Sequence, residues 1–266
     1  MKMPSLSRRR FMFLSAAASL ALKAQKGKRI PIGLQQTAVN RSLRLDFNAT
    51  IRAIAAMGYE VIEFSANTFM TWTPAKAKEV RSLLDDIHLR CRSTHNEIVS
   101  FSGDGLSKAI ELNQILGSDT LVSVRGPGTP EVRPTLDDWK RFSGQLSAAS
   151  DRIRAAGMTL GFHNHATEFE AIETTRPIDI LAANKDIASF HLNVALCLKA
   201  GGDPSAFIYQ CPGRIQTLLI QDYMGKANWK QILPAAESTG GLQFYTIERT
   251  DGLYLLEGQD DDVLDF

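Results

Sequence analysis

The chain has 266 residues, of which 44% are hydrophobic and 22% are charged, a composition typical of a globular protein with a large core. Thirty basic against 29 acidic side chains give a net charge of +1, so no excess of positive charge favours nucleic acid or an anionic membrane surface as a partner. The three cysteines are too few and too widely spaced for a disulfide framework or a zinc finger. We therefore expect a small molecule as the ligand, and a homo-oligomer remains open.

Residues 1–28 differ from the rest of the chain. Residues 7–11 include three consecutive arginines and lead into a short run of small and apolar residues at 12–22. A charged stretch before a short apolar one is typical of an export signal, and the arginines before Phe11 resemble a bacterial twin-arginine signal. The run is shorter than the roughly 20 residues of a membrane-spanning helix. We predict that residues 1–28 direct export to the periplasm or another extracytoplasmic space, without a stable membrane span.

From residue 29 onward, short β-branched runs alternate with amphipathic helical patterns, as expected for repeated βα units around a parallel sheet. Eight runs are predicted to be strands, at residues 30–34, 61–64, 90–94, 120–124, 159–163, 189–194, 216–220 and 243–247. No glycine-rich nucleotide-binding motif follows the first strand, which disfavours a doubly wound sheet. We predict an α/β fold, with a single (β/α)8 TIM barrel over residues 29–266. The short acidic stretch after the last strand predicts a short or incomplete eighth helix.

Four of the helices between the strands have recognisable starts or faces. Residues 47–57 carry apolar side chains at helical spacing. A second helix is predicted to begin after Thr73, because a proline follows at the first helical position. A third is predicted after Thr135, with an aspartate in the capping-box position. We expect Asn228 to cap the last of the four and Pro234 to bend or shorten it.

The carboxyl ends of the strands carry most of the histidines, and in a barrel of this type functional residues lie at those ends. Four of the five histidines are found there, namely His95, His163, His165 and His191. In a strand, residues two apart share a face, so His163 and His165 are expected to project side by side. A single histidine is more often structural, but four at one end of a barrel indicate a polar site.

Other charged residues at the strand ends are candidates for the same site. Glu248 ends an apolar strand, where a carboxylate is costly to bury unless it is paired or bound to a metal. Arg125 is suited to clamping a carboxylate or steadying an oxyanion, or to pairing with an acid of a neighbouring loop. Glu63 can orient a histidine or form an ion pair at the barrel mouth. Glu168, just after the histidine pair, can contact substrate hydroxyls or solvent.

Several segments taken together resemble the xylose isomerase-like superfamily of TIM barrels, often labelled sugar phosphate isomerase/epimerase. These segments are residues 58–64, 161–165 with 168–169, 199–204, 213–215 and 247–248. The resemblance spans roughly residues 29–251, and no single segment carries it alone. It implies a divalent metal at the barrel mouth and proton transfer next to a sugar carbonyl.

The resemblance also implies metal ligands at the ends of strands five to eight. His163 or His165 matches the position on strand five, and Glu248 matches the position on strand eight. Asn193 stands where the family has aspartate on strand six, and Leu219 stands where it has histidine on strand seven. Asparagine offers a neutral oxygen, whereas leucine offers no ligand atom.

A rearranged metal site is an alternative, because His191 shares the strand face of Asn193 and Asp222 follows the seventh strand. The candidate ligands are His163, His165, His191, Asn193, Asp222 and Glu248, and the candidate metals are Mn, Mg, Co and Zn. Because two positions depart from the family pattern, the metal is an expectation that rests on an incomplete ligand set.

Two functions follow from these residues. The first is an exported isomerase, epimerase or lyase that acts on an unphosphorylated sugar or keto-sugar. In it Glu248 moves the proton, His163 or His165 holds metal or serves as the partner acid, and Arg125 or His95 stabilises the enolate oxygen. The second is a catalytically degenerate barrel that binds sugar or accompanies an active homologue. A nuclease on the same fold needs a multi-zinc cluster, and the near-zero net charge disfavours it.

Overall fold

The structure is a computed structural model that describes residues 29–128 and 132–248. The chain divides into two units, Met1–Ile30 and Pro31–Phe266. The predicted export signal at residues 1–28 lies outside the described residues, and so does the predicted short or incomplete eighth helix. The description below concerns the second unit.

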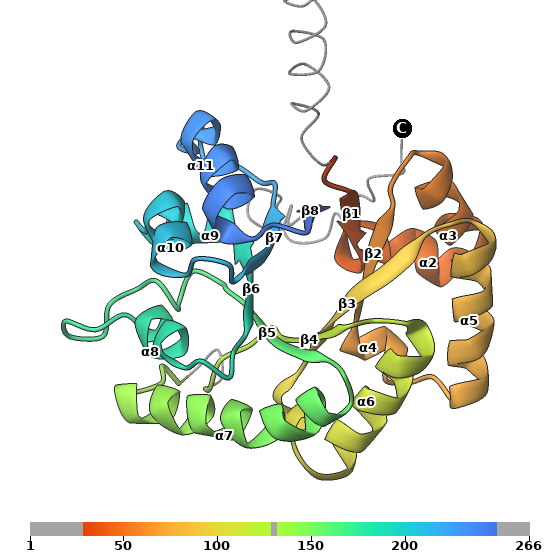
Figure 1. Ribbon diagram of the computed structural model, residues 1–266, viewed down its shortest axis with the longest axis horizontal. Helices are drawn as coiled ribbons and strands as arrows, with labels where there is room; N and C mark the ends of the chain where they lie inside the picture. The colour runs from red at the N-terminus through yellow and green to blue at the C-terminus, as the bar shows by residue number, and fades with distance from the viewer. Residues whose placement is uncertain (1–28, 129–131, 249–266) are drawn as a thin grey trace, which may run out of the picture. The chain divides into compact units, whose positions relative to one another are not determined.

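Eight parallel strands form a closed barrel in chain order, with β1 paired to both β2 and β8 (Figure 1). The strands are β1 (Ile32–Gln35), β2 (Val61–Ser65), β3 (Arg90–Asn96), β4 (Thr120–Ser123), β5 (Thr159–His163), β6 (Ser189–Asn193), β7 (Ile215–Leu219) and β8 (Phe244–Ile247). Each predicted strand is present, with both ends within two residues of the prediction. The predicted single (β/α)8 TIM barrel is therefore confirmed.

Helices connect the strands on the outside of the barrel (Figure 1). They are η1 (Gln36–Val39), α2 (Asn40–Leu45), α3 (Phe47–Ala56), α4 (Ala66–Phe69), α5 (Pro74–Asp86), η2 (Ile98–Phe101), α6 (Gly103–Leu116), α7 (Leu136–Ala155), α8 (Pro177–Ala183), α9 (Val194–Lys199), α10 (Pro204–Gln210), α11 (Trp229–Ala235) and the π-helical turn η3 (Ala236–Gly240). None of the described helices is long and apolar enough to cross a membrane.

The predicted helix starts are confirmed at two caps and corrected at a third. The Thr73 hydroxyl accepts from the backbone N–H of Lys76, and Thr135 forms a full capping box with Asp138. Asn228 precedes α11, but its side chain makes no capping hydrogen bond. Its amide contacts the Gln231 side chain instead, at 3.3 Å. The helix ends one residue after Pro234, as expected for a proline inside a short helix.

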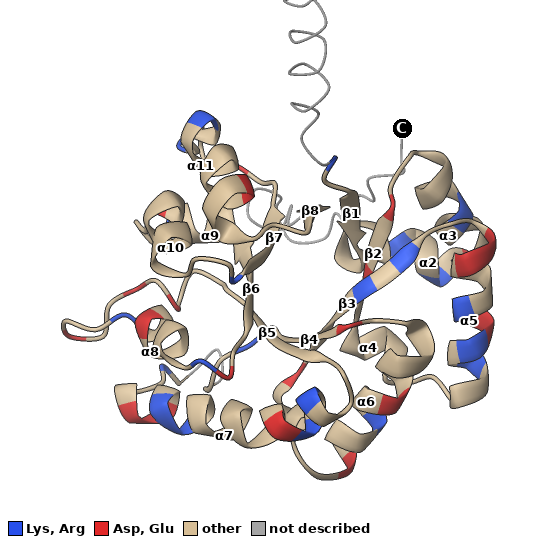
Figure 2. Ribbon diagram, viewed as in Figure 1, with Lys and Arg blue, Asp and Glu red and all other residues tan. Residues whose placement is uncertain are grey.

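Alternation along the strands sends apolar side chains outward to the helices and polar ones into the barrel. In β2, Ile62 and Phe64 belong to an apolar core with residues of α3 and α5, while Glu63 points inward. In β6, Phe190 belongs to a second core, and His191 points inward. The outer faces of α5, α6 and α7 carry acidic and basic residues together (Figure 2), in line with the near-zero net charge.

Two strands contain an extra residue that breaks this alternation. In β3 the register passes from Ile62↔Cys91 to Glu63↔Ser93, which leaves Arg92 without an opposite residue in β2. In β7 it passes from Phe190↔Ile215 to His191↔Thr217, which leaves Gln216 without one in β6. Such bulges re-aim side chains and are frequent next to functional sites.

Candidate active site

A pocket of about 210 Å³ lies at the carboxyl ends of the strands, where barrels of this type place their chemistry. The residues around it include Gln35, His95, Arg125, His163, His165 and Glu248. A larger pocket of about 600 Å³ lies at the opposite end of the barrel, beside Arg81 and Asp119. We consider the smaller pocket the candidate active site, because the strand-end histidines and Glu248 converge on it.

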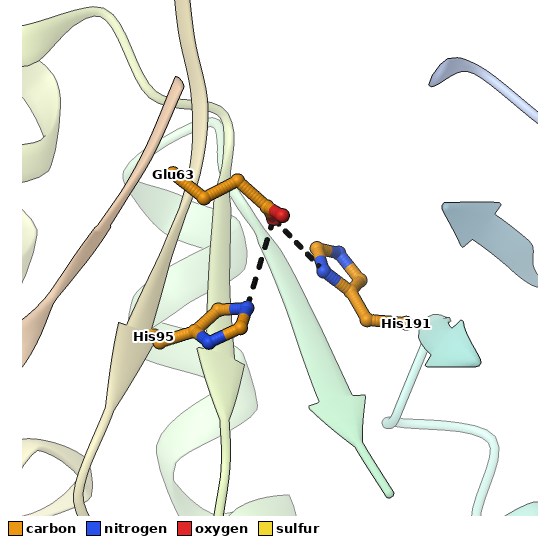
Figure 3. Close-up of side chains that lie close together, drawn as sticks. All are labelled: Glu63, His95 and His191. Carbon is orange, nitrogen blue, oxygen red and sulfur yellow. Dashed lines mark ion pairs between the residues drawn. The ribbon is translucent and has the colours of Figure 1, made fainter. Parts of the chain in front are cut away.

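A buried cluster forms the floor of this site. Glu63 Oε1 lies 3.1 Å from His191 Nδ1 and 3.7 Å from His95 Nε2 (Figure 3). The same oxygen accepts the Ser93 hydroxyl in a short hydrogen bond, and Glu63 Oε2 accepts the Thr246 hydroxyl at 3.0 Å. Burial by itself would raise the pKa of Glu63, but the charge and hydrogen bond of His191, with His95 and Ser93, lower it to about 2. Glu63 is therefore an ionised carboxylate.

Above the floor, Glu248 faces His163. Glu248 Oε2 is buried without a hydrogen-bond partner among the described residues and lies 3.9 Å from His163 Nε2. The other oxygen accepts the Thr37 hydroxyl at 3.3 Å. Burial, and then the charge of Glu63, raise the pKa of Glu248 to about 7. Burial, and then the neighbouring histidines, hold the pKa of His163 well below its usual value, so His163 is a neutral imidazole at neutral pH.

His165 and Arg125 line the outer part of the pocket. The rings of His163 and His165 lie 5.1 Å apart, as the shared strand face predicts. Burial, and then the charge of Arg125, lower the pKa of His165 to about 4. Arg125 also pairs with Glu97 at 3.4 Å, and both side chains are exposed. The structure therefore contains the loop ion pair that the sequence offered as one alternative for Arg125.

Glu168 is buried next to His165 and does not line the pocket. Its carboxyl Oε2 accepts the backbone N–H of His165 at 2.7 Å and the Thr167 hydroxyl at 3.3 Å. Burial raises the pKa of Glu168 to about 7, although these hydrogen bonds oppose the rise. The described contacts of Glu168 thus fix the loop that carries His165.

Asn193 and Asp222, two of the predicted metal ligands, use their side-chain oxygens to cap backbone N–H groups. Asn193 Oδ1 accepts from Leu196 at the start of α9, at 3.0 Å, and its amide nitrogen is buried without a hydrogen-bond partner among the residues that the structure describes. Asp222 Oδ1 accepts from Ala227 at 2.9 Å, and neither residue lines the pocket. Leu219 stands opposite Asn193 in the sheet.

Glu63, His95 and His191 could hold a metal ion, because one ligand atom from each lies within 4.8 Å of the other two. His191 fits this role, because its Nε2 contacts Gln216 Oε1 at 3.1 Å and metal-bound histidines commonly donate their second ring nitrogen to such a partner. His95 fits less well. Gln35 Nε2 lies 3.2 Å from His95 Nδ1, which places the ring hydrogen on Nε2, the atom that faces Glu63.

The orientation of the Gln35 amide is fixed by Thr37, whose backbone N–H donates to Gln35 Oε1 at 2.5 Å. Sequence reasoning missed Gln35, Thr37 and Gln216 as members of the site. The signal for the first two was present, because polar residues follow the first strand as they follow the others. Gln216 gave no such signal, because it lies near the start of its strand.

Comparison with known proteins places this geometry in a family. A model of the xylose isomerase-like TIM barrel family matches residues 51–201. One similar solved structure is a sugar phosphate isomerase/epimerase from Parabacteroides distasonis, with 22% identity, a TM-score of 0.69, and coverage of 88% of this chain and 89% of that chain.

Two other similar structures are epimerases by name. D-psicose 3-epimerase in the presence of D-fructose has 13% identity and a TM-score of 0.62, and the match covers 82% of this chain and 84% of that chain. The 3-keto-D-glucoside 4-epimerase from E. coli has 14% identity and a TM-score of 0.60, with coverage of 84% and 94%. At such identities the likeness is one of fold, and no curated protein matches the chain. The chain belongs to the xylose isomerase-like TIM barrel family.

Proposed function

We propose that the chain is an isomerase or epimerase that moves a proton beside the carbonyl of a small sugar. The observation that carries the proposal is Glu248 Oε2, a buried carboxyl oxygen without a described partner, 3.9 Å from His163 in the pocket. With its pKa raised to about 7, the Glu248 carboxyl exists in both protonation states near neutral pH. Such a group can take a proton and return it, as an isomerase or epimerase requires. A lyase would use the same base, with loss of a hydroxyl from the next carbon.

The neighbouring side chains have complementary roles in this proposal. His163 is neutral, and its Nε2 lies 3.9 Å from Glu248 Oε2. In the proposal it hydrogen-bonds a sugar hydroxyl and so limits where the reacting carbon lies. His165 is its partner acid or hydroxyl contact. Arg125 at the pocket edge and His95 at its floor stabilise the oxygen that gains charge as the proton leaves.

The lining of the pocket favours an unphosphorylated sugar or keto-sugar. Among the described residues that line the pocket, Arg125 is the one cationic side chain, and it already pairs with Glu97 at 3.4 Å. Glu97 and Glu248 add two carboxyl groups to the lining, so a phosphate dianion would meet little positive charge. The volume of about 210 Å³ suits a small ligand. The solved epimerases named above act, by their printed names, on psicose and a keto-glucoside.

A divalent ion (Mn, Mg, Co or Zn) is part of the proposal. Glu63 and His191 are the residues best oriented to hold it, and Glu248 Oε2 with His163 Nε2, 3.9 Å apart, offers a second pair of ligand atoms. When bound, such an ion supplies positive charge next to the sugar carbonyl. Thermal unfolding with and without each ion tests binding independently of activity, because a ligand of the folded state raises Tm.

The decisive experiment follows hydrogen exchange. Full-length protein, with and without added Mn²⁺ or Co²⁺, is incubated in D2O with a panel of keto-sugars, and NMR monitors the hydrogen beside the carbonyl. We expect exchange with at least one sugar, and a loss of about 10²- to 10⁴-fold in Glu248→Gln. The matched control is Glu79→Gln, an exposed carboxylate of α5, which should exchange normally. Unchanged exchange in Glu248→Gln contradicts the proposal.

A second candidate function is a sugar-binding barrel without chemistry, or a partner subunit of an active homologue. The observation that favours it is Asn193 opposite Leu219, where the family resemblance implies two metal ligands. Calorimetry with the same sugars separates the two functions. Binding that does not depend on metal, together with absent exchange, supports the binding barrel.

We also propose that residues 1–28 direct the chain out of the cytoplasm, on the sequence pattern of the consecutive arginines. Fractionation of cells that produce the full chain tests this, with Arg8, Arg9 and Arg10 changed to Lys in the comparison strain. Export of the wild type alone is the expected result.

A further inference from the structure

A chain of buried polar side chains continues below the site, away from the pocket. His191 Nε2 lies 3.1 Å from Gln216 Oε1, and Gln216 Nε2 lies 2.9 Å from Thr120 Oγ1 and 3.4 Å from Gln243 Oε1. The chain ends at an ion pair, in which Arg92 contacts Asp119 at 3.0 Å. Arg92 also donates to Gln243 Oε1, at 2.7 Å.

The two charged ends determine the direction of every hydrogen bond between them. Arg92 has donors only, so the Gln243 atom that it contacts is an oxygen, which accepts. Asp119 is an acceptor, so the Thr120 hydroxyl donates to it at 3.0 Å and uses a lone pair toward Gln216. Thr120 and Gln243 therefore both accept a hydrogen bond from the amide nitrogen of Gln216.

Only one orientation of the Gln216 amide satisfies these hydrogen bonds. Its nitrogen donates to Thr120 and Gln243, so its oxygen faces His191 and accepts from it. Gln216 is 5% exposed and His191 is fully buried, so water does not compete for these positions.

We propose that Gln216 is a positioning residue of the candidate active site, which holds the ring hydrogen of His191 on Nε2 and so turns Nδ1 toward Glu63. His191 Nδ1 then faces Glu63 Oε1 at 3.1 Å. A hydrogen or a bound cation between these two atoms is compatible with an Nε2 hydrogen that is donated to Gln216 Oε1.

Two β-bulges position the side chains of this polar chain. Gln216 and Arg92 are the two residues that the bulges of β7 and β3 leave without an opposite residue. Each therefore reaches the polar chain from a strand whose regular alternation would place it differently. His95 also contacts Glu63, but its Nδ1 receives a hydrogen bond from Gln35. His95 therefore turns its N–H toward Glu63, whereas His191 turns Nδ1 toward it.

The test reads the hydrogen positions directly by ¹⁵N NMR of the histidine rings in the full-length protein, with the His191 signals assigned by their loss in His191→Gln. We expect a hydrogen on Nε2 in the wild type. In Gln216→Met, which keeps the side-chain length but removes the amide, we expect a mixture of ring forms. Gln216→Glu, which keeps an acceptor at this position, should restore the Nε2 hydrogen. Gln114→Met, on the outer surface of α6, is the matched control and should leave His191 unchanged.

The effect on turnover rests on the proposed function, whereas the ring assignment does not. Loss of a partner that orients a histidine is expected to lower hydrogen exchange in the sugar about 10- to 100-fold in Gln216→Met, with recovery in Gln216→Glu. A wild-type His191 with its hydrogen on Nδ1 alone overturns the inference, whether or not the variants fold. Absent exchange with every sugar, beside an intact Nε2 hydrogen, contradicts the proposed function and leaves the role of Gln216 in place.

Discussion

Two buried carboxyl groups, Glu63 and Glu248, lie in one barrel, and their surroundings shift their pKa values in opposite directions. Glu63 on the floor is 0% exposed, and its oxygens meet two hydroxyls and two histidines. Glu248 at the rim is 8% exposed, and one of its oxygens has no described partner. The pKa is about 2 for Glu63 and about 7 for Glu248. Because burial is similar, the partners decide which carboxyl group is ionised and which exists in both protonation states near neutral pH.

The largest expected contrast comes from changing Glu248 to Gln. The substitution removes the proposed base, so hydrogen exchange in the sugar should fall by about 10²- to 10⁴-fold. Stability should be kept or increased at pH 8, because the substitution removes a charge that burial disfavours. Exchange rates and thermal unfolding of the same preparation check both halves, and a strong loss of stability would contradict the comparison.

The same substitution at Glu63 should act on stability instead. Glu63→Gln removes the carboxylate oxygen that the Ser93 hydroxyl and His191 contact, and loss of a buried hydrogen-bonding partner costs about 1–3 kcal/mol of unfolding free energy. Urea unfolding at pH 7 measures the loss. A cost below about 1 kcal/mol, the usual value for an exposed pair, would show that Glu63 is not held as an ionised partner.

The pH dependence separates the two carboxyl groups again. Glu248 acts as a base only when ionised, so kcat/KM should rise with pH through about 7. Its folded-state pKa lies above the ordinary 4.5, so its contribution to stability is complete below pH 4.5 and is lost as pH rises through about 7. Glu63 has the opposite sign. Its contribution is present above pH 4.5 and is lost as pH falls toward 2.

Urea unfolding between pH 3 and 8 checks these signs by difference. The stability of Glu248→Gln relative to the wild type should grow between pH 4.5 and 7, by on the order of 3 kcal/mol. That of Glu63→Gln relative to the wild type should fall between pH 3 and 4.5. Parallel curves for the two variants contradict the assigned directions.

The smallest effect is expected at Thr37, which gives Glu248 its one described hydrogen bond. Thr37→Val should raise the pH of half-maximal kcat/KM, because a donor that lowers the pKa of Glu248 is lost. The change corresponds to about 1 kcal/mol or less. Thr37→Ser keeps the hydroxyl and should retain the wild-type profile, so an equal shift in both variants points to packing instead.

The barrel and its polar mouth were predictable, because alternation along the strands decides which side chains point inward. His95, His163 and Glu248 reach the pocket as their strand-end positions predict. The opposite pKa shifts of Glu63 and Glu248 were not predictable, since they depend on partners from other strands, such as Ser93 and Thr246. Strand alternation could not show these distant contacts.

Other residues escaped prediction for local reasons. Asn193 and Asp222 accept backbone N–H groups with their side-chain oxygens, at the start of α9 and from Ala227, and their predicted role as metal ligands stays a prediction. Gln216 and Arg92 enter the polar chain through bulges, which alternation does not foresee. The role of the predicted site residues in catalysis stays a prediction until the variants are measured.

The polar chain below His191 also determines how molecules enter and leave. Gln216, Thr120 and His191 are buried between the pocket and the opposite end of the barrel, so side chains close the passage through the barrel interior. In the proposed reaction, substrate and product would therefore use the same entrance, and a bound product would block the next substrate. Progress curves with added product should show competitive inhibition, as expected for a pocket with a single entrance.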